Sequence, residues 1–334
     1  MKMKTTINRM KLFKIITGLL LLMATPGGVK AQQLSSIPGA FVDVGIGASI
    51  AAYGYAGTAS SRGATALNWN PAGIYPEEGP EATFSFVDQL EIVEYGYFSL
   101  SVPLWENRNA FALSAQVSGD ESLLEESVSV GYAHRFGFVW MGVSGSYRRA
   151  VYGKNALRAD DYVIFTPDEV TAGLDRQVSG TASGFGLDAG IQLLLTDGVV
   201  FGVTARNMAA PIAWSSWSAA RPGTKEYSES IPLEVAMGIQ YRLSDKLAGS
   251  IEWVPEIKAG SISRIGIGAA FNPVTILAIR AGRLILQDGF DNDINTFGFG
   301  LKTPPSMDLR LRADYAFITG NIARTQQVSL VIGL

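Results

Sequence analysis

The sequence has 334 residues, of which 47% are hydrophobic, and carries 27 Lys and Arg against 30 Asp and Glu, a formal net charge of −3. The acidic balance argues against a nucleic-acid partner, and the absence of cysteine excludes disulfide bonds and thiol chemistry. After the N-terminal 31 residues no stretch offers about 18 uninterrupted apolar residues, so a transmembrane helix is excluded there.

Residues 1–31 have the composition of a cleaved secretory signal peptide. Five basic residues lie within the first 14 positions, an apolar run follows at 15–24, and small residues lead to a cleavage site after Ala31. A buried N-terminal helix is the alternative, but the basic flank and the short apolar run favour the signal peptide. Cleavage would remove six Lys and Arg residues and no acidic residue, which changes the net charge from −3 to −9.

Residues 32–81 are predicted to form a compact plug rather than strands. The stretch 39–57 is rich in Gly and Ala and shows no alternation of apolar and polar residues. We expect residues 37–69 to occupy the lumen of the barrel described next. The motif Asn70-Pro71-Ala72-Gly73 is predicted to be the hinge between plug and wall. Pro71 should end a short helix or turn over 64–69, and Gly73 can supply a positive φ that redirects the chain.

From residue 82 to residue 334 nearly every segment alternates apolar with small or polar residues, which is typical of β-strands. Fourteen strands are predicted, near residues 82–87, 95–104, 109–118, 124–136, 138–151, 180–195, 199–207, 232–243, 247–253, 263–272, 275–284, 296–303, 309–317 and 325–334. Fourteen is an even number, as bacterial outer-membrane barrels require.

An exported, Gly-rich chain without membrane helices can meet lipid as a closed barrel, because all its backbone groups then pair between strands. The predicted fold is therefore all-β: a fourteen-stranded antiparallel transmembrane β-barrel over 82–334 with an N-terminal lumen plug. A soluble β-sandwich is the alternative. It fits less well, because nearly every strand has a full apolar face and few segments remain to cover a second sheet.

The alternation also assigns a face to each side chain. In one strand Phe111, Leu113 and Val117 point to one side, and Ala112 and Ser114 to the other. We assign the apolar rows to lipid and the opposite rows to the lumen. The charged residues predicted to face the lumen are Arg148, Asp188, Arg206, Glu234, Arg242, Glu252, Arg264, Arg280, Arg310, Arg312 and Asp314. Because both signs are present, we expect them to pair with one another and with the plug rather than to form an ion filter.

Connection lengths alternate along the predicted wall. One set is short, as at 105–108 and 196–198, whereas the other includes the long connections 152–179, 208–231 and 285–295. Short periplasmic turns opposite long outer loops are typical of bacterial outer-membrane barrels. We therefore expect the protein in the bacterial cell outer membrane, in contact with its lipid, with residues 82 and 334 at the periplasmic end.

The long connections are predicted to carry an interaction surface. Trp214 and Trp217 lie in the predicted loop 208–231, and Phe165 lies in an apolar run of the predicted loop 152–179. Packing of one loop on the other is one interpretation. Contact with a partner or ligand is the other, because large aromatic side chains dominate interface energetics.

Catalytic chemistry is not predicted. His134 is the single histidine, so a Ser-His-acid hydrolase would depend on it. It lies beside Arg135 and Phe136 near a predicted strand end, where a role at the membrane interface is expected. A zinc site would need several His or Cys ligands. We therefore expect no enzyme activity, no metal and no cofactor.

Three N-terminal segments carry a family resemblance. They read Gly-Tyr-Ala-Gly-Thr-Ala at 54–59, Leu-Asn-Trp-Asn-Pro-Ala-Gly-Ile at 67–74 and Ala-Thr-Phe-Ser-Phe at 82–86. Together they resemble the N-terminal portion of the PorV/PorQ family of FadL-type outer-membrane barrels. The resemblance implies fourteen strands with an N-terminal plug. Two departures are Tyr53-Gly-Tyr-Ala56 in place of Met-Gly-Gly-Ala, and Arg62-Gly63 in place of an acidic pair.

Two functions are predicted from these observations. The resemblance implies a barrel that binds secreted cargo or secretion-system proteins, in type IX secretion or in surface attachment of cargo. The alternative is a FadL-like channel for uptake of hydrophobic small molecules beside the plug. A predicted lumen rich in Arg, Asp and Glu, without an evident apolar track, favours the first.

Overall fold

The computed structural model describes Phe41 and residues 44–76, 79–104, 108–119, 123–153, 178–218, 221–257, 263–287, 293–321 and 324–334. The predicted signal peptide 1–31, the start of the predicted plug and Phe165 lie outside the described residues. Among the described residues, no helix has the length and apolar character needed to cross a bilayer.

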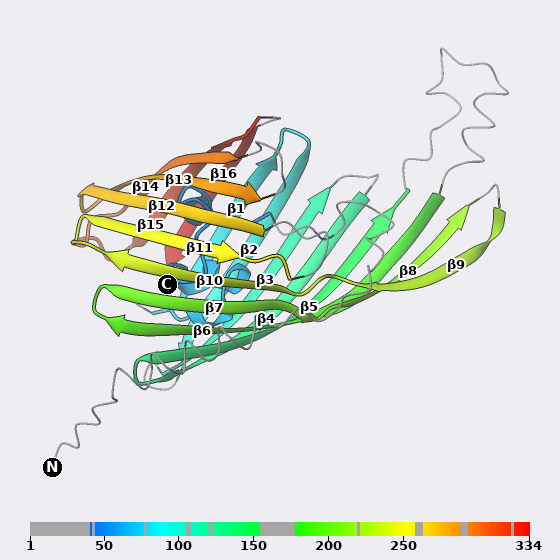
Figure 1. Cartoon of the computed structure of the whole chain (residues 1–334), viewed down its shortest axis with the longest axis horizontal. Helices are drawn as coiled ribbons and strands as arrows, with labels where there is room; N and C mark the ends of the chain where they lie inside the picture. The colour runs from blue at the N-terminus through cyan, green and yellow to red at the C-terminus, as the bar shows by residue number, and fades with distance from the viewer. Residues whose placement is uncertain are drawn as a thin grey trace. The chain divides into compact units, whose positions relative to one another are not determined.

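Fourteen strands form a closed antiparallel wall (Figure 1). Chain neighbours pair with each other, β7 pairs with β10, and the pairing of β1 with β16 closes the ring. The wall strands are β1 (Glu81–Gln89), β2 (Val93–Leu104), β3 (Asn109–Gly119), β4 (Leu123–Phe136), β5 (Val139–Tyr152), β6 (Val178–Thr196), β7 (Val199–Ala209), β10 (Glu234–Arg242), β11 (Leu247–Val254), β12 (Ser263–Val274), β13 (Leu277–Gln287), β14 (Ile294–Lys302), β15 (Arg310–Thr319) and β16 (Arg324–Gly333). The predicted barrel is confirmed, and each predicted strand boundary lies within three residues of the observed one.

The connection 208–231 is a β-hairpin, and its prediction as a loop is wrong. β8 (Pro211–Ser218) pairs with residues 178–184 of β6, and β9 (Arg221–Ser230) pairs with β8. Because β6 has 19 residues and β7 has 11, the first part of β6 extends beyond β7 and pairs with β8 instead. Pro211 is compatible with this pairing, since proline is tolerated as the first residue of a strand. Figure 1 shows the hairpin continuing the sheet beyond the ring.

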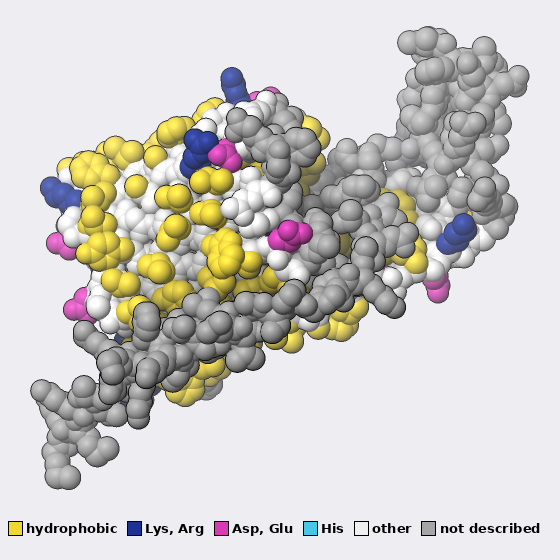
Figure 2. Space-filling view, viewed as in Figure 1, with side chains coloured by type: hydrophobic (Ala, Val, Ile, Leu, Met, Phe, Trp, Pro, Cys, Tyr) yellow, Lys and Arg dark blue, Asp and Glu magenta, His cyan; other side chains and the backbone are white. Residues whose placement is uncertain are grey.

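The two faces of the wall differ as the alternation predicts. In β3 the side chains of Phe111 and Leu113 are 43% and 37% exposed, whereas Ala112 and Ser114 are buried. Figure 2 shows hydrophobic side chains over the visible outer surface of the wall, with charged side chains toward its margins. An outward apolar band on a closed barrel matches the hydrocarbon layer of a bilayer.

Val130 offers a test of the lipid-facing assignment, because it lies on the outer face in the middle of β4 and is exposed. We expect Val130→Arg to destabilise the barrel by about 2–4 kcal/mol, since a guanidinium near the bilayer midplane loses its hydration. Val130→Leu keeps the apolar surface and is the control. Urea unfolding in lipid vesicles measures the difference, and equal stability of the two variants would contradict a lipid-facing position.

Residues 44–76, called here the inner segment, lie inside the ring. They form short helices, namely α2 (Ala48–Ala51) and the 3-10 helices η1 (Gly63–Asn68) and η2 (Pro71–Gly73). Thr58 N donates to Glu252 Oε2 of β11 at 2.6 Å, and Ser99 Oγ of β2 donates to Ala64 O at 2.9 Å. Since β2 and β11 are seven strands apart in the ring, the inner segment crosses the lumen. This arrangement supports the predicted plug.

Glycines allow the inner segment to lie against the wall. Gly54 adopts a φ of +68°, and a Cβ added to it would lie 2.1 Å from the backbone oxygen of Ile267. Added Cβ atoms on Gly266 of β12 and Gly282 of β13 would each lie 2.3 Å from backbone atoms of Gly54. A side chain at any of these three glycines would therefore push the segment away from the wall.

Candidate functional site

The Asn-Pro-Ala-Gly motif at 70–73 holds the inner segment in place. Asn70 is fully buried, and its Oδ1 accepts a hydrogen bond from Ala72 N at 3.0 Å, which caps η2. Its Nδ2 donates to Thr58 O at 2.8 Å, which ties the motif to an earlier part of the inner segment. Helix η1 ends at Asn68, as Pro71 predicts.

The motif differs from the predicted hinge in two respects. Gly73 does not adopt a positive φ; it lies in η2, where an added Cβ would be 2.4 Å from Ser61 O, so glycine is required for space. The motif also packs on the wall, because a Cβ on Gly190 of β6 would lie 1.9 Å from Asn70 Oδ1. A Cβ added to Gly142 of β5 would lie 2.2 Å from the carbonyl carbon of Pro71. Residues 70–73 therefore anchor the segment on β5 and β6.

Several of the predicted lumen charges meet in a first ion-pair network at Glu234 of β10. Its Oε1 accepts a hydrogen bond from Arg206 Nη2 of β7, and its Oε2 lies 2.7 Å from Arg264 Nη1 of β12. Arg206 also donates to Asn68 O of the inner segment at 3.5 Å. The network therefore links three strands of the wall to the inner segment.

A second network is centred on Asp314 of β15. Its Oδ1 accepts from Arg280 Nη1 of β13 at 2.7 Å, and its Oδ2 accepts from Arg312 Nε at 2.8 Å. The Asp314 side chain is 0% exposed. A fully buried carboxylate between two guanidiniums depends on both partners to replace its lost hydration.

The remaining predicted lumen charges also face inward. Glu252 is buried and accepts the Thr58 N–H already described. Asp188 Oδ1 accepts from Asn207 N at 2.7 Å, and Arg148 Nη2 donates to Asn207 Oδ1 at 2.9 Å. Arg242 and Arg310 line a cavity at the short-turn end of the barrel. Most of these charged side chains thus pair with one another or with the inner segment, whereas the side chain of Arg242 has no such partner among the described residues.

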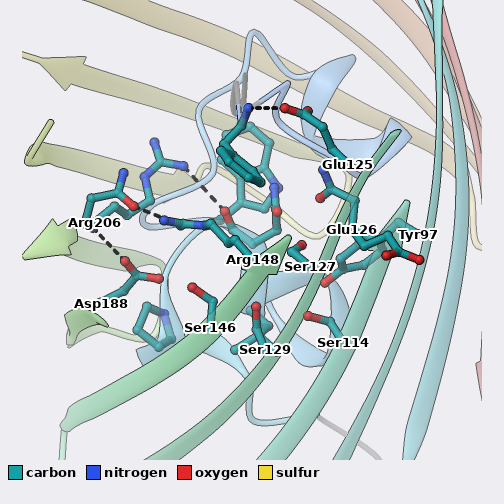
Figure 3. A pocket seen from close by; sticks show the side chains of 17 residues that line it. Tyr97, Ser114, Glu125, Glu126, Ser127, Ser129, Ser146, Arg148, Asp188 and Arg206 are labelled. Atoms are coloured by element: carbon teal, nitrogen blue, oxygen red, sulfur yellow. Dashed lines mark hydrogen bonds between the residues drawn. The ribbon is translucent and has the colours of Figure 1, made fainter. Parts of the chain in front are cut away.

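A cavity of about 110 Å³, called here the outer cavity, lies between the inner segment and the wall (Figure 3). The inner segment contributes Leu67, Trp69 and Pro71 to its lining. The wall contributes mainly polar side chains, among them those labelled in Figure 3: Tyr97, Ser114, Glu125, Glu126, Ser127, Ser129, Ser146, Arg148, Asp188 and Arg206. The outer cavity is therefore polar on the wall side and mainly apolar on the side of the inner segment, where Asn68 is the polar exception among the described lining residues.

The predicted exposure of Trp214 is wrong, because its side chain is only 2% exposed. β8 continues the alternation of the wall and turns Trp214 to the inner face. The ring stacks on Tyr227 at 6.0 Å between centroids, and lies 6.0 Å from Tyr152 and 6.3 Å from Phe41. Its Nε1 donates to Glu229 Oε1 at 2.6 Å. These four rings are called here the aromatic cluster.

Phe41 connects the aromatic cluster to the outer cavity. Its ring packs against Trp214, and its side chain also lines the cavity. The position of Phe41 is held from the wall, because its backbone N–H donates to Glu125 Oε1 at 2.6 Å. Packed apolar side chains therefore extend from the hairpin β8–β9 to the outer cavity.

The other two predicted loop aromatics have different outcomes. Trp217 is exposed, at 49%, as predicted, whereas Phe165 lies outside the described residues. Sequence reasoning missed the roles of Phe41, Tyr152 and Tyr227. The alternation of apolar with small residues over 212–216 was the available signal, since it indicates a strand and hence an inward row.

No protein-family model and no curated protein matches this chain. The toluene transporter TbuX of Ralstonia pickettii is similar in structure, with a TM-score of 0.57 and 16% identity over 86% of this chain and 97% of its own. The Pseudomonas putida toluene transporter TodX has a TM-score of 0.54 and 14% identity, covering 85% and 96%. A Pseudomonas aeruginosa FadL homologue has a TM-score of 0.55 and 12% identity, covering 85% and 97%.

The fold is that of a FadL-type outer-membrane barrel. At these identities the likeness establishes the fold and not the substrate. With a closed wall of fourteen strands and an apolar outer band, the protein lies in the bacterial outer membrane. The resemblance to the PorV/PorQ family stays a prediction, because no family model matches the chain.

Proposed function

We propose that the protein is a FadL-like outer-membrane channel that passes small hydrophobic, aromatic molecules. The observation that carries this proposal is the aromatic cluster, which continues through Phe41 to the outer cavity. In the sequence, a lumen without an evident apolar track favours a protein-binding barrel. The buried ring of Trp214 and its neighbours supply such a track. TbuX and TodX, which share the fold, are toluene transporters, and this agrees with the proposal.

The size of the outer cavity bears on how a solute would pass. An apolar cavity of about 150 Å³ holds one benzene molecule. The outer cavity, at about 110 Å³, is smaller and partly polar. A solute that leaves the aromatic cluster would therefore need the inner segment to shift before it could move further. In this proposal the aromatic cluster captures the solute, and the inner segment controls its passage.

Trp214→Ala tests the capture step. We expect the initial rate of uptake of radiolabelled toluene into proteoliposomes, at a subsaturating concentration, to fall by about twofold to tenfold. The reason is that aromatic contacts contribute about 0.5–1.5 kcal/mol beyond their buried area. Heat-modifiable gel migration checks that the barrel remains assembled.

Trp217→Ala is the matched control, because Trp217 lies on the same hairpin but is exposed. Its uptake rate should equal that of the unchanged protein. An equal loss in both variants, or a loss in Trp217→Ala alone, would contradict capture by the aromatic cluster.

The exposed ring of Trp217 favours a second candidate function, a barrel that binds a protein partner through the hairpin β8–β9. Large exposed aromatic side chains are frequent anchors of protein interfaces. In that case Trp217→Ser would release secreted or surface-attached proteins that co-purify in mild detergent, while toluene uptake stays unchanged. The two measurements on one variant separate the two functions.

A further inference from the structure

A second cavity, called here the basic cavity, lies on the short-turn side of the inner segment and has a volume of about 670 Å³. Turn residues 303–305 and the C-terminal end of β16 contribute to its lining. Among the described residues that line it, six have a cationic side chain: Arg62, Arg242, Arg280, Lys302, Arg310 and Arg312. The carboxylates among its lining residues are those of Glu81 and Asp308. The excess of cations is local, since the whole chain has a net charge of −3.

Part of this positive charge is not neutralised by the protein. In the part of the chain that the structure describes, the side chains of Arg242 and Lys302 make no hydrogen bond or ion pair. Cations gathered in a concave site with low-dielectric walls raise the local concentration of anions.

Two buried hydroxyl groups add an independent observation. Tyr53 and Ser61 belong to the inner segment, line the basic cavity and are 5% and 1% exposed. Among the described residues neither Tyr53 Oη nor Ser61 Oγ has a hydrogen-bond partner. A buried hydroxyl without a partner is costly, and a bound acceptor would satisfy it.

We propose that the basic cavity binds a compact oxyanion with two or more negative charges, such as a solute that carries a phosphate group. Guanidinium groups bind the oxygens of phosphate through paired, charge-assisted hydrogen bonds, and an ammonium group binds them as a point charge. Because neither hydroxyl oxygen is exposed to solvent, the side chains of Tyr53 and Ser61 would turn toward the same oxygens to donate to them as neutral donors. The basic cavity is lined by the inner segment, the wall and the turn at 303–305, so the ligand is a solute that enters from the short-turn side. This site is distinct from the aromatic cluster and does not depend on the proposed uptake function.

The test is titration calorimetry of the purified full chain with inorganic phosphate, at low ionic strength in an uncharged detergent without phosphate. We expect saturable binding by the unchanged protein. The double variant Arg242→Gln/Lys302→Gln should bind about tenfold more weakly, because two charged donors are lost. Neither side chain has a partner among the described residues, so the barrel should remain assembled, as heat-modifiable migration would check.

Tyr53→Phe removes a single hydroxyl and should weaken phosphate binding by about threefold, the effect of one neutral hydrogen bond. Arg149→Gln is the control, because Arg149 pairs with Glu126 away from the basic cavity and its loss should leave binding unchanged. The absence of saturable binding, or displacement of phosphate by chloride at equal ionic strength, would overturn the proposal. So would an equal loss in Arg149→Gln, since that result would indicate nonspecific attraction.

Discussion

Deletion of residues 37–69 is expected to raise the single-channel conductance of the barrel on the order of tenfold or more, since it removes the material that fills the lumen of a wide barrel. The described part of this stretch bonds to β2 on one side of the ring and to β11 on the other. The polar inner side chains of the wall would then border water. Recordings in planar lipid bilayers measure the change, and unchanged conductance would contradict a segment that closes the lumen.

A point variant separates this effect from a failure of assembly. Gly54→Leu would place a Cβ 2.1 Å from the backbone oxygen of Ile267 and should displace the inner segment from β12. We expect an intermediate rise in conductance from this variant. Gly145→Leu is the matched control, because the nearest atom to its Cβ would be 3.9 Å away, on Gly186 of the neighbouring strand. It should leave conductance unchanged.

The strands of the wall could be predicted because the alternation of their side chains can be read from neighbouring residues in the sequence. Lipid outside and polar groups inside impose a period of two on every strand, and Phe111 with Ala112 shows the pattern within two residues. For the hairpin β8–β9, the alternation over 212–216 indicates a strand but not the strand with which it pairs. Its place depends on the length by which β6 exceeds β7, and that difference involves residues far apart in sequence. The buried position of Trp214 follows from that pairing.

The inner segment was predicted as a region but not in its contacts. Its lack of alternation and its glycines indicate a compact, non-strand conformation, and Pro71 correctly predicts the end of η1. The contacts of Asn70 with Thr58, and the close approach of Gly190, join residues that are distant in the chain. The sequence suggests that Gly73 adopts a positive φ, whereas the structure shows that glycine is needed there because a Cβ would collide with Ser61 O. Sequence indicates that a small residue is needed there, but not which neighbour requires it.

Asp314→Ala should be the most damaging change to a lumen side chain, with an expected loss of about 3–5 kcal/mol in the free energy of unfolding. The carboxylate is 0% exposed and bonds to Arg280 at 2.7 Å and to Arg312 at 2.8 Å. Its removal leaves two guanidiniums inside the barrel without their shared anion. Arg312 is 37% exposed and can regain water, so the lower end of this range is expected. Urea unfolding in lipid vesicles gives the difference in free energy.

Two control variants distinguish the effect of removing a buried, paired carboxylate from the effect of removing any carboxylate. Asp308→Ala removes an exposed acidic side chain near the same end of the barrel and should change stability by less than about 0.5 kcal/mol. Adding Arg280→Gln to Asp314→Ala should restore part of the lost stability, because one uncompensated buried cation is removed. If Asp314→Ala is as stable as Asp308→Ala, or if the second change lowers stability further, the pairing around Asp314 does not hold the wall together in this way.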